Sequence, residues 1–111
     1  MVSALDLSGL PLLYSDDDVI VVGVNYFVYI LRCADGTLYT GSTNDVQARL
    51  LKHNEGKGAR YTAARGPVQV VYSEEHISRS DAQLREAQIK HWTRAKKEAL
   101  IAGDVTRLRH L

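Results

Sequence analysis

A hairpin in residues 26–42 constrains the fold of this chain more than any other feature of its sequence. Residues 26–33 are rich in β-branched and aromatic side chains and predict a strand, and residues 37–42 predict a second, shorter one. The three residues between them, Ala34-Asp35-Gly36, are typical of a tight turn. The sequence therefore predicts two adjacent antiparallel strands.

The length of this turn decides which side chains share a face of the sheet. A three-residue loop with Gly36 in the left-handed conformation would pair Tyr29 with Gly41 and place Tyr29 and Tyr39 on one face. A two-residue Asp-Gly turn would place the two tyrosines on opposite faces. The final glycine favours the three-residue loop.

A helix and a polar loop are predicted directly after the hairpin. Asn44 offers a helix N-cap with a glutamine three residues later, and Val46, Leu50 and His53 follow with helical spacing. Two glycines end the pattern, and residues 55–66 read as a polar, basic loop.

The remainder predicts one more strand and two helices. A strand is expected at Val68–Ser73, a helix from a Ser80 cap to about Trp92, and a last helix from a Thr93 cap to Gly103. The order is β-β-α-β-α-α. It predicts an α/β fold in which a small three-stranded antiparallel sheet is flanked by helices.

Charge divides the chain into an acidic leader and a basic body. Residues 1–25 carry four aspartates and no lysine or arginine, whereas the remaining 86 residues hold all 14 basic side chains against nine acidic ones, a net +5. We expect an extension over 1–25, one domain over 26–103 and a tail over 104–111. A basic body suggests a polyanionic partner.

The leader has three competing interpretations. Val19–Val22 could pack as a short strand against the edge of the sheet, or Asp16–Asp18 could lie near the basic face and compete with a polyanion. The third interpretation is a tail without structure, or an upstream extension from a misassigned start.

Several classes of protein are excluded at this level. The longest uncharged stretch, Val19–Leu31, has 13 residues, fewer than the roughly 20 that a membrane-spanning helix requires. The acidic leader does not resemble a signal peptide. Cys33 is the only cysteine and cannot form an internal disulfide, so a reducing cytoplasmic setting and no membrane association are expected.

Two places in the sequence combine residues suited to phosphate chemistry. Arg49 and His53 are four residues apart on the first predicted helix and share a face, so they could bind a phosphate and move a proton, or simply be a solvated arginine and a helix-end histidine. Glu86 lies on a half-apolar stripe with Ala82 and Ile89. It could hold a divalent cation or form an ordinary ion pair with Lys90.

The ordered set of motifs resembles the GIY-YIG nuclease superfamily, in particular its small single-domain bacterial branch, over residues 26–102. The resemblance is carried by Phe27-Val28-Tyr29, nine residues, Tyr39-Thr40-Gly41, then Arg49 and His53, followed by Gly56-Lys57-Gly58-Ala59-Arg60-Tyr61-Thr62 and Arg85-Glu86-Ala87-Gln88-Ile89-Lys90. Phe27 and Thr40 depart from the family's usual glycine and isoleucine, and no asparagine follows Asn54, where many members have a late one.

The resemblance implies a metal-dependent endonuclease that acts on DNA, with RNA not excluded and a role in repair or recombination possible. It implies that Tyr29 activates the nucleophile, that Tyr39 positions water and phosphate, that Arg49 and His53 belong to the catalytic set, and that Glu86 binds one Mg²⁺ or Mn²⁺ ion. Arg49 and the cation would lower the pKa of Tyr29. Basic and aromatic side chains expected to contact nucleic acid are Lys52, Lys57, Arg60, Tyr61 and Lys90.

Two alternatives belong to other functional classes. A non-catalytic module with this fold would bind DNA without metal-dependent cleavage. A protein-interaction module would use the basic face to bind an acidic partner. Because the domain is small, a protein partner could also supply specificity to a nuclease.

Overall fold

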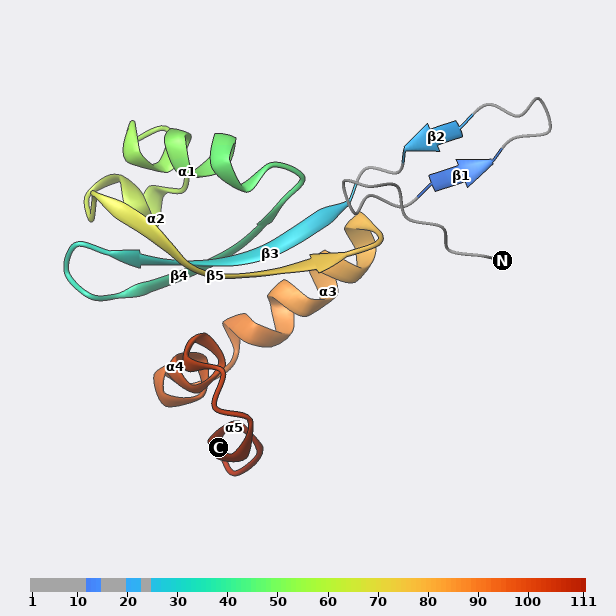
Figure 1. The fold of residues 1–111 in the computed structure, drawn as a ribbon. Coiled ribbons are helices and arrows are strands. Elements are labelled where there is room, and N and C mark those ends of the chain that lie inside the picture. Colours follow the sequence, from blue (N-terminus) through green and yellow to red (C-terminus); the bar gives the residue numbers. More distant parts are fainter. Residues whose placement is uncertain (1–11, 15–19, 23–24) are drawn as a thin grey trace.

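The computed structural model describes residues 12–14, 20–22 and 25–111, and its core is a three-stranded antiparallel sheet in the order β4-β3-β5 (Figure 1). The elements are β1 (Leu12–Tyr14), β2 (Ile20–Val22), β3 (Tyr26–Cys33), β4 (Leu38–Thr43), α1 (Val46–Asn54), α2 (Arg60–Ala63), β5 (Val68–His76), α3 (Arg79–Lys90), α4 (Arg94–Ala102) and α5 (Val105–Arg109). The predicted fold class and the predicted order of the main elements are confirmed.

The central strand β3 divides the core into two layers. Val28 and Ile30 pack with Ala82 and Ile89 of α3 on one face. The other face buries a second cluster of Tyr29, Leu31, Cys33 and Val68, against which α1 packs. Figure 1 shows α1 and α2 on one side of the sheet and α3 and α4 on the other. This alternation follows from the two-residue period of a strand that is covered on both faces.

The hairpin has the register that the three-residue turn predicts. Gly36 has a φ of 85°, the Cys33 amide donates to the Thr37 carbonyl at 2.8 Å, and Tyr29 pairs with Gly41. Tyr29 and Tyr39 therefore share a face, and their ring centroids are 6.4 Å apart. The two-residue alternative is excluded.

Two predicted helix starts were wrong by one or two residues. The cap of α1 is Asp45, not Asn44, because the Asp45 carboxylate accepts the Ala48 amide at 3.0 Å from an extended backbone. The cap of α3 is Ser78, not Ser80, and its hydroxyl accepts the Asp81 amide at 3.1 Å. The predicted Thr93 cap and the predicted end at Gly103 are confirmed for α4.

Three further segments differ from expectation. The polar loop 55–66 contains the short helix α2, strand β5 continues past Ser73 to His76, and the segment expected as a tail contains α5. In the leader, β2 pairs with β1 in a two-stranded sheet of its own and not with the three-stranded sheet. Asp16–Asp18 and Val19 lie outside the described residues. None of the helices in the described part of the chain has the length and apolar character that crossing a membrane demands.

Candidate active site

Tyr29, Tyr39 and His53 form a compact group on the α1 side of the sheet. The Tyr29 hydroxyl lies 3.0 Å from His53 Nε2, and the Tyr39 and His53 rings are 5.1 Å apart at their centroids. Tyr29 and His53 are each only 2 % exposed. Strands β3 and β4 supply the tyrosines and α1 supplies the histidine, so the group depends on the hairpin register described above.

Two glycines leave room for the rings of this group. A Cβ at Gly41 would lie 2.5 Å from the Tyr29 hydroxyl and 2.7 Å from Cζ, so the phenol crosses β4 where that strand has no side chain. A Cβ at Gly58 would lie 2.8 Å from both Cγ and Cε1 of His53. Any side chain at these two positions would displace the tyrosine or the histidine.

Burial determines the electrostatics of the Tyr29–His53 pair. Burial raises the pKa of Tyr29 well above its ordinary value, and Tyr39 adds to the increase, while the nearby charge of Arg49 opposes it only in part. Burial also lowers the pKa of His53, and Arg49 lowers it further. Arg49 acts on the pKa of Tyr29 in the expected direction, but without a cation desolvation outweighs the arginine. The group is a neutral phenol beside a neutral imidazole.

Arg49 lies on the exposed face of α1 between two shallow clefts. The larger cleft, about 230 Å³, is also lined by Tyr26, Ser42, Arg79 and Gln83, and the smaller one, about 180 Å³, by residues that include Lys52. Its guanidinium is close enough to influence the pKa of both Tyr29 and His53. Arg49 is therefore available to an anionic group that enters beside the tyrosine.

Glu86 reaches the same edge of the sheet from the opposite face. Its neighbours on α3, Ala82 and Ile89, are fully buried, whereas the Glu86 side chain is 18 % exposed. One carboxylate oxygen accepts the Ser42 hydroxyl at 2.6 Å, and the other pairs with Lys90 Nζ at 2.6 Å. The predicted half-apolar stripe is confirmed, and the ion pair considered as its alternative also forms.

The edge strand β4 brings these groups together. Gly41, over which Tyr29 lies, is followed directly by Ser42, which holds Glu86. The Glu86 charge contributes to the raised pKa of Tyr29, so the two groups interact across the strand. Because no strand among the described residues lies beyond β4, a ligand can reach both faces of the sheet at this point.

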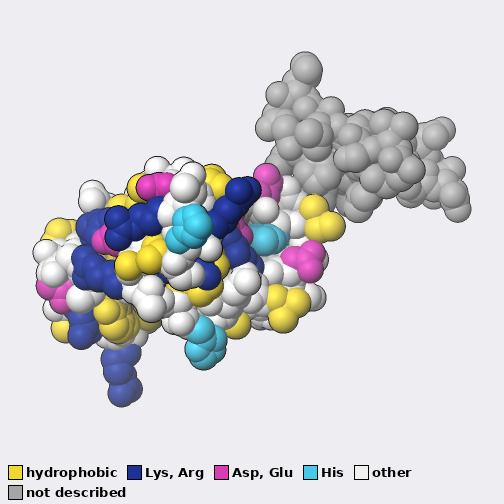
Figure 2. Space-filling model, turned by 90° about the horizontal axis from the view of Figure 1, so that it is seen from below, with side chains coloured by type: hydrophobic (Ala, Val, Ile, Leu, Met, Phe, Trp, Pro, Cys, Tyr) yellow, Lys and Arg dark blue, Asp and Glu magenta, His cyan; other side chains and the backbone are white. Residues whose placement is uncertain are grey.

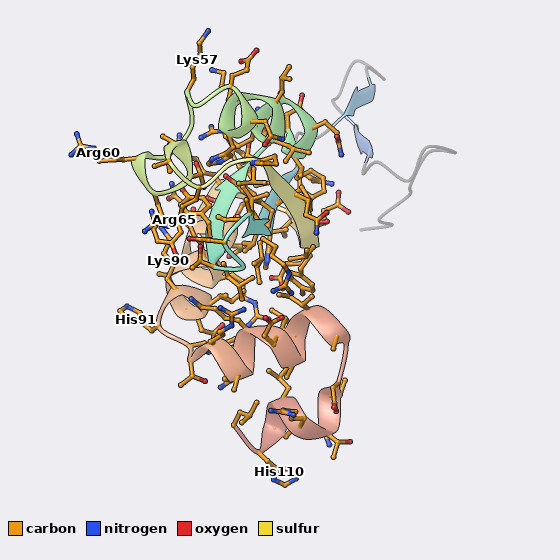
Figure 3. All side chains as sticks on the ribbon, turned by 90° about the vertical axis from the view of Figure 1, so that its left-hand side faces the viewer. Lys57, Arg60, Arg65, Lys90, His91 and His110 are labelled. Carbon is orange, nitrogen blue, oxygen red and sulfur yellow. The ribbon has the colours of Figure 1, made fainter. Side chains whose placement is uncertain are left out.

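The predicted nucleic-acid contacts are distributed around this edge. Figure 3 shows Lys57 and Arg60 extending away from the body of the protein. Tyr61 is 38 % exposed, and its ring centroid lies 6.0 Å from that of Tyr39. The guanidinium carbon of Arg65 lies 4.1 Å from the centroid of the Tyr61 ring. Lys90 pairs with Glu86 and so lies within the candidate site itself.

Several participating residues were missed by sequence reasoning. Ser42 stands in no recognisable pattern, and Gly58 and Thr62 were quoted within the motif that resembles the family, with no site role of their own. Arg79 and Lys97 line clefts near the two ends of β4, and sequence reasoning singled out neither of them. Figure 2, which views the molecule from below, shows several Lys and Arg side chains interspersed with other types over this face.

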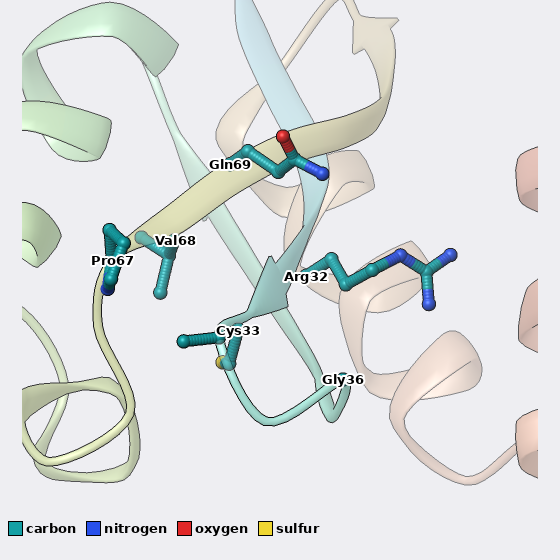
Figure 4. A pocket seen from close by; sticks show the side chains of 7 residues that line it. Arg32, Cys33, Gly36, Pro67, Val68 and Gln69 are labelled. Carbon is teal, nitrogen blue, oxygen red and sulfur yellow. The ribbon is translucent and has the colours of Figure 1, made fainter.

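A separate cavity in the described part of the chain does not belong to this site. It measures about 370 Å³ and lies between the hairpin turn and the start of β5 (Figure 4). It is lined by Arg32, Cys33, Ala34, Gly36, Pro67, Val68 and Gln69, none of which contacts the tyrosine pair through a side-chain hydrogen bond. Cys33 is a buried free thiol that packs with Tyr29, Leu31 and Val68.

A preformed cluster of metal ligands is also missing from residues 12–14, 20–22 and 25–111: no three His, Cys, Asp or Glu side chains converge. Mg²⁺ often takes one or two carboxylates and completes its shell with water and substrate oxygens. The Glu86 carboxylate, with a hydroxyl beside it at an open edge, is a hard-oxygen donor of this kind.

Comparison with known proteins identifies the family. The family model described as the GIY-YIG catalytic domain matches residues 25–99. A UPF0213 protein of Bacillus pumilus is 51 % identical over 77 residues, covering 69 % of this chain and 79 % of its own. The UPF0213 protein SERP0126 of Staphylococcus epidermidis is 53 % identical over 76 residues, covering 68 % of this chain and 93 % of its own.

A solved structure agrees with this assignment. The solution NMR structure of the protein EF2693 from E. faecalis is 37 % identical, covers 71 % of this chain and 84 % of its own, and has a TM-score of 0.51. The matched region contains the sheet, both tyrosines, Arg49, His53 and Glu86. The chain thus belongs to the GIY-YIG family, with small bacterial UPF0213 proteins as its relatives.

Proposed function

We propose that this protein is a divalent-metal-dependent endonuclease that hydrolyses phosphodiester bonds in DNA. The observation that carries the proposal is the meeting of four groups at the edge strand β4: the Tyr29 phenol, the His53 imidazole, the Arg49 guanidinium and the Glu86 carboxylate. Phosphodiester hydrolysis needs a base, a positive charge on the phosphate and stabilisation of the leaving oxygen. These four groups supply each requirement.

Tyr29 acts as the base through His53. A free phenolate is unfavourable because burial raises the pKa of Tyr29. The phenol can instead accept a proton from the attacking water while it passes its own proton to His53 Nε2, 3.0 Å away. This transfer needs a neutral His53 with an unprotonated Nε2, and the lowered pKa of His53 maintains the neutral form.

The phosphate and the leaving oxygen are held by the other two groups. Arg49 offers planar donors that match two oxygens of a phosphate. Glu86 would hold Mg²⁺ or Mn²⁺, which would take the place of the Lys90 ammonium on one carboxylate oxygen. When bound, the cation supplies positive charge to the leaving oxygen. Tyr39, beside both Tyr29 and His53, closes the other side of the group and helps to place water and phosphate.

Basic side chains extend the site in both directions along β4. The cleft with Arg79 adjoins one end of the strand, and a cleft of about 200 Å³ with Tyr61 and Lys97 adjoins the other. The five steps between residues 38 and 43 span about 17 Å at the usual rise of a strand. A nucleic-acid backbone that follows this edge would meet positive charge on each side of the tyrosines.

The experiment is cleavage of labelled linear, nicked, flapped and branched DNA, with and without Mg²⁺ or Mn²⁺. The wild type should cleave at least one substrate only with metal. Glu86→Gln should abolish cleavage and retain binding, whereas Glu55→Gln, a matched change at an exposed helix end, should leave the rate unchanged. Full activity of Glu86→Gln with Mg²⁺ would exclude metal binding at this carboxylate.

One observation favours a second candidate, a nucleic-acid-binding module without catalysis. The Glu86–Lys90 pair satisfies the carboxylate without any metal. In that case, DNA binding should weaken steeply with salt, and no substrate in the panel should be cut under any metal condition.

A further inference from the structure

We propose that Thr62 is a positioning residue that fixes the tautomer of His53 so that the histidine can accept the Tyr29 proton. The tautomer is inferred from hydrogen bonds alone, and its effect on cleavage rests on the proposed function. Thr62 is fully buried, and its hydroxyl lies 2.7 Å from His53 Nδ1. The same hydroxyl donates to the Ala59 carbonyl at 3.0 Å.

The number of available protons determines which atom donates in each of these hydrogen bonds. A hydroxyl has one proton to donate and two lone pairs that accept, and a carbonyl can only accept. With the Thr62 proton on the Ala59 carbonyl, Thr62 must accept from His53, so the proton of the neutral ring is on Nδ1. His53 Nε2 is then unprotonated and accepts the Tyr29 hydroxyl proton.

The opposite tautomer leaves a buried donor without a partner. If Thr62 donated to Nδ1, the ring proton on Nε2 would point at the Tyr29 oxygen, and the Tyr29 proton would have no acceptor among the hydrogen bonds of the described residues. Tyr29 is 2 % exposed, and an unpaired buried donor costs about 1–3 kcal/mol. The Nδ1–H tautomer is therefore the stable one.

The surroundings hold Thr62 and the ring in place. Thr62 lies in the first turn of α2, where its amide donates to Ala59 at 3.1 Å. The backbone of Gly58 lies against the His53 ring, with no space between them for a side chain. The short helix thus places a hydroxyl against the one ring nitrogen that does not face Tyr29.

The test combines a spectroscopic signature with kinetics. The ¹⁵N chemical shifts of the two ring nitrogens of a neutral histidine distinguish the protonated one from the other. The His53 signals can be assigned by replacing the remaining histidines one at a time, at His76, His91 and His110. We expect wild-type His53 to carry its proton on Nδ1, Thr62→Ser to preserve this tautomer, and Thr62→Val to lose it.

The cleavage rate should depend on which ring nitrogen of His53 carries the proton. Thr62→Val should slow metal-dependent cleavage by about 10- to 100-fold, by analogy with removing the partner that orients a metal-binding histidine. Thr62→Ser should restore a rate close to that of the wild type. Thr40→Val makes the same chemical change at another buried threonine, whose hydroxyl has no hydrogen-bond partner among the described residues, and should leave the rate unchanged.

The outcomes separate this inference from the proposed function. A wild-type His53 protonated on Nε2 would overturn the inference, as would a Thr62→Val variant that folds and keeps both the Nδ1–H signature and full activity. If Thr62→Val fails to fold, the wild-type and Thr62→Ser spectra still decide the tautomer. If the spectra show the Nδ1–H form but no DNA is cut, the proposed function fails and the assignment of the tautomer stands.

Discussion

Gly58→Ala is the substitution whose effect follows most directly from the geometry of the site. The added Cβ would lie 2.8 Å from Cγ and Cε1 of His53, and ordinary contacts begin at 3.4 Å. Nδ1 of His53 would lie closer still to the added Cβ, so the ring or the loop must retreat by more than about 0.6 Å. Both hydrogen bonds of the ring, at 3.0 Å to Tyr29 and 2.7 Å to Thr62, depend on its present position.

The expected cost can be estimated from these contacts. Overpacking a buried site, or leaving a buried polar group unpaired, costs about 1–3 kcal/mol in the free energy of unfolding. A loss of about 2 kcal/mol would lower the melting temperature by about 8–16 °C in a domain of this size. Thermal unfolding measures the first effect. The ring resonances of His53 and the DNA cleavage rate measure the displacement itself.

A neighbouring glycine provides the control. Gly56 has a φ of 75°, and a Cβ there would meet nothing within 4 Å. Gly56→Ala should therefore cost about 1–2 kcal/mol of stability through backbone strain but leave the ring resonances unchanged. If Gly58→Ala has the same ring resonances and cleavage rate as Gly56→Ala, the close approach of Gly58 to His53 does not determine the site.

Four further predictions concern charge, burial and pH. Arg49→Ala should reduce cleavage by about 2–4 kcal/mol of transition-state stabilisation, and a single-turnover rate that stays unchanged while only affinity falls would show that Arg49 merely anchors the substrate. Arg79→Ala should reduce the slope of log affinity against log salt by about 0.9 on duplex DNA, measured without metal, whereas Arg109→Ala, an exposed basic residue of α5, should not. Thr40→Val should stabilise the fold by about 1 kcal/mol in chemical denaturation, because it removes a buried hydroxyl that has no partner in the part of the chain that the structure describes; a loss of stability would imply an acceptor for that hydroxyl. Because the pKa of His53 is lowered on folding, the unfolded chain binds this proton more readily, so stability should fall as the pH drops below about 6.5, and a His53→Gln variant should show less of this decline.

Local rules were enough to predict the hairpin and its consequences. Gly36 sets the turn, the turn sets the register, and the register places Tyr29 over Gly41. The half-buried stripe around Glu86 was equally predictable, because helical spacing alone places Glu86 between Ala82 and Ile89. Features that depend on a short range of sequence could thus be predicted before any contact was known.

Contacts between distant segments could not be predicted in this way. Thr62 is nine residues from His53, in a segment that looks like a loop, and only the packing of α2 against α1 brings their side chains together. The raised pKa of Tyr29 also comes from tertiary burial, which outweighs the local effect of Arg49. The helix starts were misplaced because two capping residues stood close together in each case, and their backbone angles decided between them.

The position of β4 at the margin of the sheet limits how this protein can assemble with others. Its outer backbone groups have no partner strand among the described elements, which is the usual place for a second chain to attach by extending a sheet. A strand added there would lie beside Gly41 and Ser42 and cover the gap between Tyr29 and Glu86. Sheet extension on that side is thus incompatible with access to the site. A partner that lengthens the sheet and leaves the site open must attach along β5, the opposite margin.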